Sequence, residues 1–447
     1  MYEAIVIGGG PGGYVAAIRL SQLGKKVAIV EKEEFGGTCT NKGCIPTKAL
    51  LTTSHLFSEI NEKAKKFGIL VDNVSYDLSL IMKHMQKAVS MSKKGIEFLM
   101  KKNKIDVFKD KAILKDKNTI LLEKSGKQIQ AENIVLAHGS VPNIFPPFDK
   151  VEGIWTSDDV FKMEKLPQSL LVIGGGVIGV EFATFFSSFG VDVTIVELAN
   201  HILPYEDNDV AEEVKKGLVK NKVKIIEGEK VEEIKRSEDK YIAKVAEKEI
   251  EVEKILLAVG RKPNISEDIK SIGIEIERGV KTDKHMRTNI ENVYAVGDIR
   301  GEIMLAHVAM YEGIVAAHNI AGQEIEMDYS AVPSIIFSNP EVASVGKKEK
   351  DVEKEKVNIY KFPVSANGRA RTMEEKLGFA KVIEEKETKK VLGVAIVSAN
   401  ATDMIMEGVL GVKYNMTSHQ IAEAIHPHPT LTETLLGAFE GNFAIHI

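Results

Sequence analysis

Residues 4–31 read AIVIGGGPGGYVAAIRLSQLGKKVAIVE, and this stretch governs how the first part of the chain folds. An apolar run leads into glycines with the G-x-G-x-x-G spacing, at Gly8, Gly10 and Gly13. A helix-like stretch follows, and a second apolar run ends at Glu31. The pattern predicts a βαβ unit whose glycines let the backbone approach a pyrophosphate at the helix N-terminus, while Glu31 accepts hydrogen bonds from a ribose. A close strand–helix contact without any ligand is the alternative.

The same unit recurs in residues 170–197, which read LLVIGGGVIGVEFATFFSSFGVDVTIVE. Its glycines Gly174, Gly176 and Gly179 and its acid Glu197 each follow the matching residue of the first unit by 166 positions. Two units with equal spacing predict two dinucleotide sites, which is common in enzymes that pass electrons between a nicotinamide and a flavin. Glu197 would accept a hydrogen bond from a free 2′-hydroxyl and repel a 2′-phosphate, which predicts NAD rather than NADP.

The only two cysteines of the chain, Cys39 and Cys44, lie in residues 36–48, which read GGTCTNKGCIPTK. The surrounding glycines and Pro46 predict a turn that enters a helix, where the positive end of the helix dipole stabilises a thiolate. Cytosolic disulfides are usually catalytic or redox-sensing. The pair is therefore predicted to form a redox-active disulfide beside a flavin, with two unrelated buried thiols as the alternative.

The composition indicates a globular protein of several domains, because 44% of its 447 residues are hydrophobic and 28% are charged. A formal net charge of −5 gives no basic footprint for nucleic acid. No apolar run reaches the roughly 18–20 residues that a membrane span needs. The first residues lead directly into a strand rather than a signal peptide. We therefore expect a cytoplasmic protein with no nucleic-acid or membrane partner and no metal site.

Four further sequence motifs occur between residues 259 and 433. They are VGRKPN at 259–264, AVGD at 295–298, MLAH at 304–307 and HPHPTLTE at 426–433. Together with the two glycine-rich units and the cysteine pair, they make the chain similar to the flavoprotein disulfide reductases. These belong to the class I pyridine nucleotide-disulfide oxidoreductases, and within them the chain most resembles the dihydrolipoamide dehydrogenases. The resemblance implies an α/β fold with two Rossmann-like FAD- and NAD-binding domains and an α+β C-terminal dimerisation domain.

The resemblance also implies how the chain is divided. The predicted domains are a first FAD-binding part at 1–143, an NAD-binding domain at 144–263, a second FAD or central part at 264–328, and an interface domain at 329–447. Within the interface domain, the mixed charges of residues 347–356 predict a solvated face.

Further cofactor contacts are implied by the same resemblance. Those toward FAD come from Thr38, Lys48, Ala112, Gly139, Asp298 and Ala306. Those toward NAD come from Glu181, Val231 and Gly260. Lys48 is expected near the flavin nitrogen that accepts hydride, where it would pair with Glu181. His138 stands where the family usually has Thr, so no hydroxyl bond is expected there.

A dithiol substrate must lose a proton before it attacks a disulfide, and histidine is the natural base near neutral pH. His428 is followed five residues later by Glu433, which would orient the imidazole and stabilise its charged form. His426 is the competitor, but the family motif begins at His428. The resemblance implies that Cys39 exchanges with the substrate, that Cys44 lies nearer the flavin, and that His428 and Glu433 act across a homodimer interface.

The function that the resemblance implies is oxidation of protein-bound dihydrolipoamide, with electrons passing through FAD to NAD⁺. The implied partners are a second copy of the chain and a lipoyl-bearing protein of a 2-oxo acid dehydrogenase or glycine cleavage complex. Another NAD(P)H-dependent disulfide or metal-ion reductase of the superfamily is the nearest alternative. A flavin-loaded scaffold subunit without turnover is an alternative of a different class.

Overall fold

The first glycine-rich unit folds into a parallel sheet in the computed structural model, which describes residues 1–441. Its parallel strands run in the order β3-β2-β1-β6-β17. Their bounds are Tyr2–Ile7 (β1), Val27–Val30 (β2), Asp106–Phe108 (β3), Gln128–Leu136 (β6) and Val293–Ala295 (β17). Strands β4 (Ala112–Leu114) and β5 (Thr119–Leu122) form an antiparallel extension on β6. The apolar runs of β1 and β2 are buried because both faces of the sheet are covered.

The second unit folds in the same way. Its parallel strands run in the order β11-β10-β9-β15-β8, and the first four match β3-β2-β1-β6 of the first sheet in both position and chain order. Their bounds are Trp155–Thr156 (β8), Ser169–Ile173 (β9), Asp192–Glu197 (β10), Lys224–Glu227 (β11) and Lys254–Leu257 (β15). A small antiparallel sheet accompanies it, made of β12 (Val231–Ser237), β13 (Lys240–Val245) and β14 (Lys248–Val252). The prediction of two Rossmann-like units is confirmed.

Four glycines explain why each strand can turn so tightly into its helix. Gly8 and Gly174 have φ of +108° and +103°, a region that residues with a Cβ rarely adopt. A Cβ on Gly13 would stand 1.9 Å from the carbonyl oxygen of Gly8, and one on Gly179 would stand 1.9 Å from that of Gly174. The helices α1 (Pro11–Gln22) and α6 (Val177–Ser188) therefore begin directly against the ends of β1 and β9.

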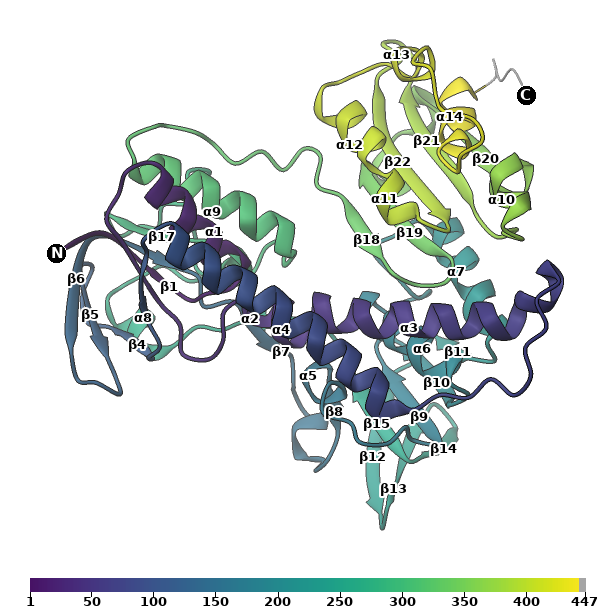
Figure 1. Ribbon diagram of the computed structural model, residues 1–447, viewed down its shortest axis with the longest axis horizontal. Helices are drawn as coiled ribbons and strands as arrows, with labels where there is room; N and C mark the ends of the chain where they lie inside the picture. Colours follow the sequence, from purple (N-terminus) through teal and green to yellow (C-terminus); the bar gives the residue numbers. More distant parts are fainter. Residues whose placement is uncertain (442–447) are drawn as a thin grey trace.

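The cysteine stretch lies on short helix α2 (Gly37–Lys42) and at the start of long helix α3 (Cys44–Glu62). Helix α3 reaches from the first nucleotide-binding half to the second, where it contacts α6 (Figure 1). Helix α4 (Leu78–Lys102) runs back beside it and is capped by the carboxylate of Asp77. In the first half, α9 (Ala306–Ile320) lies alongside α1 (Figure 1).

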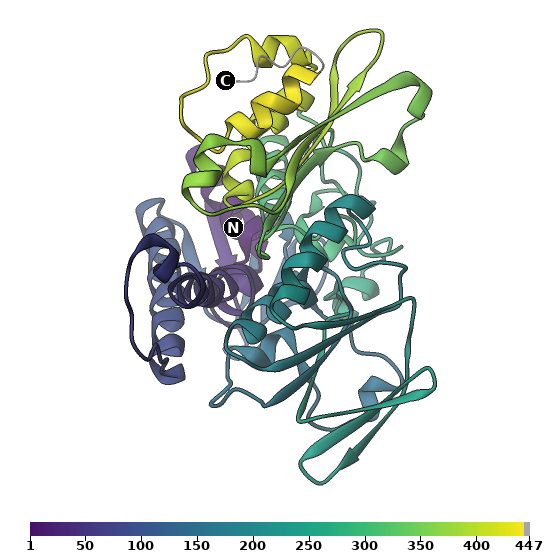
Figure 2. The same cartoon turned by 90° about the vertical axis from the view of Figure 1, so that its right-hand side faces the viewer.

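The C-terminal part forms a third unit that rises above the other two (Figures 1 and 2). Its five antiparallel strands run in the order β18-β19-β22-β21-β20. Their bounds are Ser334–Ile336 (β18), Glu341–Gly346 (β19), Val357–Pro363 (β20), Phe379–Glu385 (β21) and Val391–Ser398 (β22). Its helices are α10 (Gly368–Thr372), α11 (Ala401–Met404), α12 (Met406–Lys413), α13 (Ser418–Ala422) and α14 (Glu433–Glu440). The predicted α+β class of this part is confirmed.

Two short strands join the nucleotide-binding halves. Strand β7 (Ser140–Pro142) is where the chain leaves the first half, and β16 (Arg261–Pro263) pairs with it where the chain returns. This pairing supports the boundaries at 143 and 263, which we retain as proposals together with the one at 328. The last six residues of the predicted interface domain lie outside the described part of the chain. Within residues 1–441, no helix is both long and apolar enough to cross a membrane.

The prediction of a solvated face at residues 347–356 is wrong at two positions. Lys348 forms an ion pair with buried Glu206, and Glu349 accepts a hydrogen bond from the buried ammonium of Lys381 at 2.8 Å. Charges that alternate along a strand end or loop usually remain in water, but here residues distant in sequence compensate them. This part of the charge run is therefore an internal contact between domains.

Candidate active site

A cavity of about 1660 Å³ lies between the two nucleotide-binding halves and reaches the C-terminal part. It exceeds the roughly 300–1,000 Å³ of an ordinary small-ligand pocket, so it has room for two dinucleotides. The predicted residues that line it are Gly8, Gly10, Glu31, Thr38, Cys39, Cys44, Lys48, Ala112, Gly139, Gly174, Gly176, Glu181, Glu197, Val231, Gly260, Asp298 and Ala306. Two fingerprint glycines, Gly13 and Gly179, do not line it. They are packed against the preceding glycine loops, and their contact with a cofactor stays a prediction.

The glycine loops leave open space where a pyrophosphate would rest. A Cβ on Gly176 would meet nothing within 4 Å, and one on Gly10 would approach only the Cα of Gly37, at 3.9 Å. Both residues are the N-caps of helices, α6 and α1, whose N-termini face the cavity. Backbone N–H groups and the helix dipole favour an anion there. The residues present therefore fit two dinucleotides.

Glu31, which follows β2, and Glu197, the last residue of β10, accept equivalent hydrogen bonds from backbone amides. Glu31 accepts hydrogen bonds from the amides of Gly9 and Glu33, each at 2.7 Å. Glu197 accepts them from Gly175 at 2.6 Å and Ala199 at 2.7 Å, the positions 166 residues further on. Each carboxylate thus fixes the glycine loop beside it. A carboxylate has about four lone-pair sites, so both retain capacity for a ribose hydroxyl.

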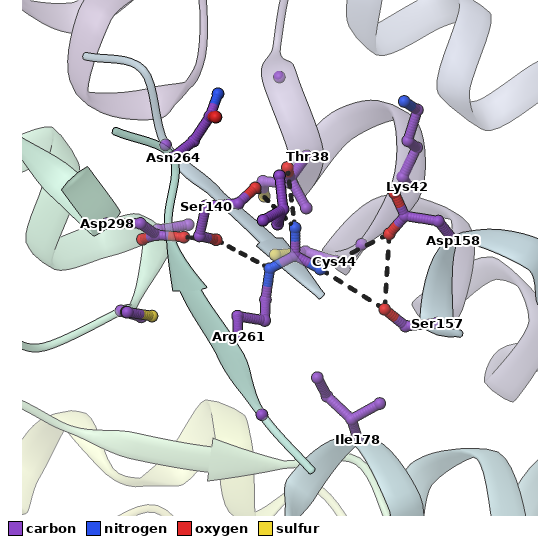
Figure 3. Close-up of a pocket in the computed structure, with 18 of the residues that line it drawn as sticks. Thr38, Lys42, Cys44, Ser140, Ser157, Asp158, Ile178, Arg261, Asn264 and Asp298 are labelled. Carbon is purple, nitrogen blue, oxygen red and sulfur yellow. Dashed lines mark hydrogen bonds and ion pairs between the residues drawn. The ribbon is translucent and has the colours of Figure 1, made fainter. Parts of the chain in front are cut away.

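Asp298, at the start of the short 3₁₀ turn Gly297–Arg300, is joined to the cysteine region by a chain of polar groups (Figure 3). The hydroxyl of Ser140 donates to Asp298 at 2.5 Å and accepts from the Arg261 Nε at 2.8 Å. The same guanidinium donates to the hydroxyl of Thr38, the residue before Cys39, at 3.5 Å and forms an ion pair with Asp158 at 3.5 Å. The motif at 259–264 was recognised from the sequence, but no role was predicted for the side chain of Arg261. Its position directly after Gly260, which lines the cavity, could have indicated one.

The other predicted contacts are backbone positions on the cavity wall. Gly139 and Gly260 have positive φ, and a Cβ on either would meet nothing within 4 Å, so their backbones are open to the cavity. Ala112 begins β4, Val231 begins β12 and Ala306 begins α9. His138 also lines the cavity, and its buried Nδ1 has no hydrogen-bond partner among residues 1–441, so this nitrogen is free to meet a bound group.

The two cysteines are free thiols that lie close together, half-buried at the junction of α2 and α3. Cys44 is the first residue of α3, so the helix N-terminus favours its thiolate. A hydrogen bond from Cys39, together with the positive charge of Lys48, lowers the pKa of Cys44 to about 7. That hydrogen bond and burial raise the pKa of Cys39. As the pH rises through about 7, Cys44 therefore loses its proton first, while Cys39 keeps its own.

Lys48 and Glu181 form an ion pair on the wall of the cavity. The Lys48 Nζ donates to both carboxylate oxygens of Glu181, at 2.8 and 2.9 Å. Glu181 also accepts from the amide of Phe337 at 3.1 Å, and the ammonium lies 4.6 Å from the centre of the Phe337 ring. The structure thus brings together the two residues that were expected to pair. Phe337 was not anticipated, because it belongs to the C-terminal part.

His428 and Glu433 lie away from the cavity on the surface of the C-terminal part. The Nδ1 of His428 is 2.8 Å from Glu433 Oε1, and the histidine side chain is 64% exposed. Burial alone would raise the pKa of Glu433, but the amide of Thr430 and the ring of His428 outweigh it and lower this pKa. His426 differs, because its side chain is 7% exposed and pairs with Glu407 at 3.3 Å. His428 is therefore exposed, and its Nε2 has no hydrogen-bond partner among residues 1–441.

The hydrogen bond between the thiols is testable through the pKa of Cys44. We expect Cys39→Ala to raise this pKa above its value of about 7, because the variant removes the main contact that stabilises the thiolate. The measurement is thiolate absorbance at 240 nm against pH in reduced, anaerobically desalted protein, with Cys44→Ser as the blank. Cys39→Ser is the matched control, since its hydroxyl still donates and should raise the pKa less. An unchanged midpoint in Cys39→Ala would contradict the assignment.

Comparison with known proteins agrees with this geometry. Residues 2–313 match the pyridine nucleotide-disulphide oxidoreductase family, and residues 332–439 match its dimerisation domain. The chain is 40% identical to a dihydrolipoyl dehydrogenase of Bacillus subtilis, over 98% of this chain and 96% of the relative. It is 40% identical to a mitochondrial dihydrolipoyl dehydrogenase of Dictyostelium discoideum, over 97% and 92%.

Among solved structures, the HOCl-induced flavoprotein disulfide reductase RclA of Escherichia coli is similar, with a TM-score of 0.88 and 26% identity. The similarity covers 98% of this chain and 99% of that one. Family and fold therefore agree with the two glycine loops that fit dinucleotides, which we call the two dinucleotide cradles, and with the cysteine pair between them. The chain belongs to the pyridine nucleotide-disulphide oxidoreductases and is an FAD-dependent disulfide oxidoreductase of this family, whose members use FAD and NAD(H).

Proposed function

We propose that this chain oxidises a protein-bound dihydrolipoyl group to its cyclic disulfide and delivers the electrons to NAD⁺. One observation carries the proposal: the Cys39–Cys44 pair lies on a cavity that also holds two dinucleotide cradles. Relatives about 40% identical over nearly their whole length carry the name dihydrolipoyl dehydrogenase, which supports this substrate.

The first cradle would hold FAD and the second NAD⁺. For FAD the residues are Gly8, Gly10, Glu31, Thr38, Lys48, Ala112, Gly139, Asp298 and Ala306. For NAD⁺ they are Gly174, Gly176, Glu181, Glu197, Val231 and Gly260. Bound FAD supplies the two-electron chemistry that links a dithiol to a nicotinamide. Lys48 and Arg261 are two of the cations that line the cavity, and Lys48 would sit at the flavin beside the thiolate of Cys44.

The chemistry of the thiols starts from the oxidised Cys39–Cys44 pair. His428 takes a proton from one substrate thiol, and the resulting thiolate attacks Cys39 Sγ. The Cys39–Cys44 bond breaks and Cys44 leaves as a thiolate, which the N-terminus of α3 and the ammonium of Lys48 stabilise. The sulfur of the second substrate thiol then attacks the substrate sulfur bonded to Cys39, and its proton passes to Cys39 as the Cys39–substrate bond breaks. This closes the cyclic disulfide and releases Cys39 as a thiol, while the first proton leaves His428 for solvent.

The base would come from the second subunit of a homodimer. His428 and Glu433 do not line their own chain's cavity, yet their geometry suits proton transfer. Exposed apolar side chains lie on the same C-terminal part, namely Met406, Leu410, Tyr414 and Ile425. A large exposed apolar surface of this kind marks a protein contact. The match to a dimerisation domain supports the same arrangement.

The physiological partner would be a lipoyl-bearing protein of a 2-oxo acid dehydrogenase or glycine cleavage complex. The cytoplasmic location expected from the composition stays a prediction.

The test uses the flavin-loaded protein mixed anaerobically with dihydrolipoamide, followed by NAD⁺. We expect a long-wavelength absorbance band from the thiolate beside the flavin, and then formation of NADH at 340 nm. A band with NADH but none with dihydrolipoamide would keep the family and exclude this substrate, as expected for another disulfide reductase of the superfamily. Bound flavin without any turnover would favour a scaffold subunit.

The role of His428 is tested by His428→Gln, which keeps a polar side chain but removes the base. We expect dihydrolipoamide oxidation to fall by about 10²–10⁴-fold, the usual contribution of a general base. His426→Gln is the matched control and should fall much less. Hybrid dimers of His428→Gln and Cys39→Ser chains should regain activity, because one site then has an intact pair and an intact base. Inactive hybrids would refute the arrangement across two subunits.

Nucleotide preference is tested by Glu197→Arg combined with Leu198→Arg. We expect the ratio of kcat/KM for NADP⁺ over NAD⁺ to rise by about tenfold or more, because a repelling carboxylate is replaced by two cations. Total activity should also fall, since the amides of Gly175 and Ala199 lose their acceptor. An unchanged ratio would mean that Glu197 does not face the ribose.

A further inference from the structure

A buried ammonium group joins the C-terminal sheet to the second nucleotide-binding half. The side chain of Lys381, on β21, is 1% exposed. Its Nζ lies 2.7 Å from Asp207, 2.9 Å from Asp209 and 2.8 Å from Glu349. Burial alone would lower the pKa of Lys381, but hydrogen bonds to Asp207, Glu349 and Asp209 outweigh it and raise this pKa. The lysine is therefore charged, and it occupies the centre of the three carboxylates.

Two of these carboxylates belong to the start of α7 (Asn208–Lys220), which lies against the C-terminal sheet (Figure 1). Three further lysines of the C-terminal part reach the same segment. Lys348 pairs with Glu206, Lys361 pairs with Asp209 at 2.5 Å, and Lys350 donates to the carbonyl oxygen of Pro204 at 3.2 Å. The segment 204–209 is thus held from one side by four lysines.

Residues 198–207, which follow Glu197 and overlap the start of the segment 204–209, form what we call the nucleotide loop. Leu198, Pro204 and Tyr205 line the cavity beside Glu197. The amide of Leu203 donates to the carbonyl oxygen of Gly175 at 2.8 Å, and a Cβ on Gly175 would stand 2.8 Å from the side chain of Ile202. The loop therefore packs directly on the second glycine fingerprint.

The loop is held in a conformation that it would not keep alone. Leu203 has φ of +51°, which is unfavourable for a bulky side chain, and its side chain is 2% exposed. Such a backbone persists only when its surroundings impose it. Those surroundings are the glycine fingerprint at one end and the lysines of the C-terminal part at the other.

We propose that Lys381 is a positioning residue of the NAD⁺ site: by holding Asp207 and Asp209 against β21, it fixes the nucleotide loop in its binding conformation. Lys381 touches neither the cavity nor the cysteine pair, so it acts through the loop. The inference rests on the assignment of the second cradle to NAD⁺. It also links the nucleotide site to the part of the chain that carries His428.

The test is Lys381→Met, which keeps the length of the side chain and removes its charge. We expect the Kd for NAD⁺ of the flavin-loaded protein, measured by isothermal titration calorimetry, to rise about tenfold. In steady state, kcat/KM for NAD⁺ should fall by the same factor, while kcat/KM for dihydrolipoamide stays within about twofold. The two values separate because the thiol exchange and the nucleotide reaction are distinct halves of a ping-pong cycle.

Three controls separate positioning from general loosening. Val382→Ala removes two methyl groups from the neighbouring buried residue and should lower the thermal midpoint without changing NAD⁺ affinity. Lys389→Met removes a lysine whose partner is Glu384 of the same sheet and should change neither quantity. Lys348→Met loosens the loop at Glu206 and should weaken NAD⁺ in the same direction, which keeps the test available if Lys381→Met does not fold.

An unchanged Kd for NAD⁺ in Lys381→Met, or in Lys348→Met if only that variant folds, overturns the proposal. Equal losses of kcat/KM for both substrates overturn it as well, and so does a matching loss of affinity in Val382→Ala. If the wild type binds NAD⁺ but does not oxidise dihydrolipoamide, the proposed substrate fails while the binding comparison still tests Lys381. If the wild type does not bind NAD⁺, the assignment of the second cradle fails, and the inference with it.

Discussion

The ion pair between Lys48 and Glu181 is the contact at which all three parts of the molecule meet. Lys48 comes from the helix that begins with Cys44, Glu181 from the helix of the second fingerprint, and Phe337 of the C-terminal part completes the group. The Glu181 side chain is only 5% exposed, so its charge requires these partners. Loss of one partner from a buried pair typically costs about 3–5 kcal/mol. The arrangement of the cavity therefore depends on all three parts being in place.

The two nucleotide-binding halves have the same local structure where each glycine loop meets its helix. Each needs a backbone turn too tight for a side chain, a helix N-terminus free to face an anion, and an acid at the end of the neighbouring strand. The structure shows that the acid also acts within the protein, because Glu31 and Glu197 accept hydrogen bonds from the amides of their own glycine loops. A single carboxylate thus shapes the loop and remains available to a ribose.

The electrostatic surroundings of the two thiols give them different pKa values. Cys44 has the helix N-terminus, the ammonium of Lys48 and the thiol of Cys39 beside it, and each of these stabilises its charged form. Cys39 has burial and an adjacent thiolate, which keep it protonated. The asymmetry does not come from the residue type but from these neighbours, first the hydrogen bond from Cys39 and then the ammonium of Lys48. It makes Cys44 the sulfur that is more readily present as a thiolate.

Local patterns were sufficient for the two βαβ units and the turn at the cysteines, because glycine geometry and apolar periodicity act between residues close in the chain. The pairing of Lys48 with Glu181 was reached from family resemblance rather than from pattern. Arg261, the amide of Phe337 and the buried charges around Lys381 were not anticipated. Each of these joins segments more than a hundred residues apart, or depends on which charges are taken out of water. A charge run such as residues 347–356 has the same composition whether it is solvated or buried, since the partners that compensate it come from another domain.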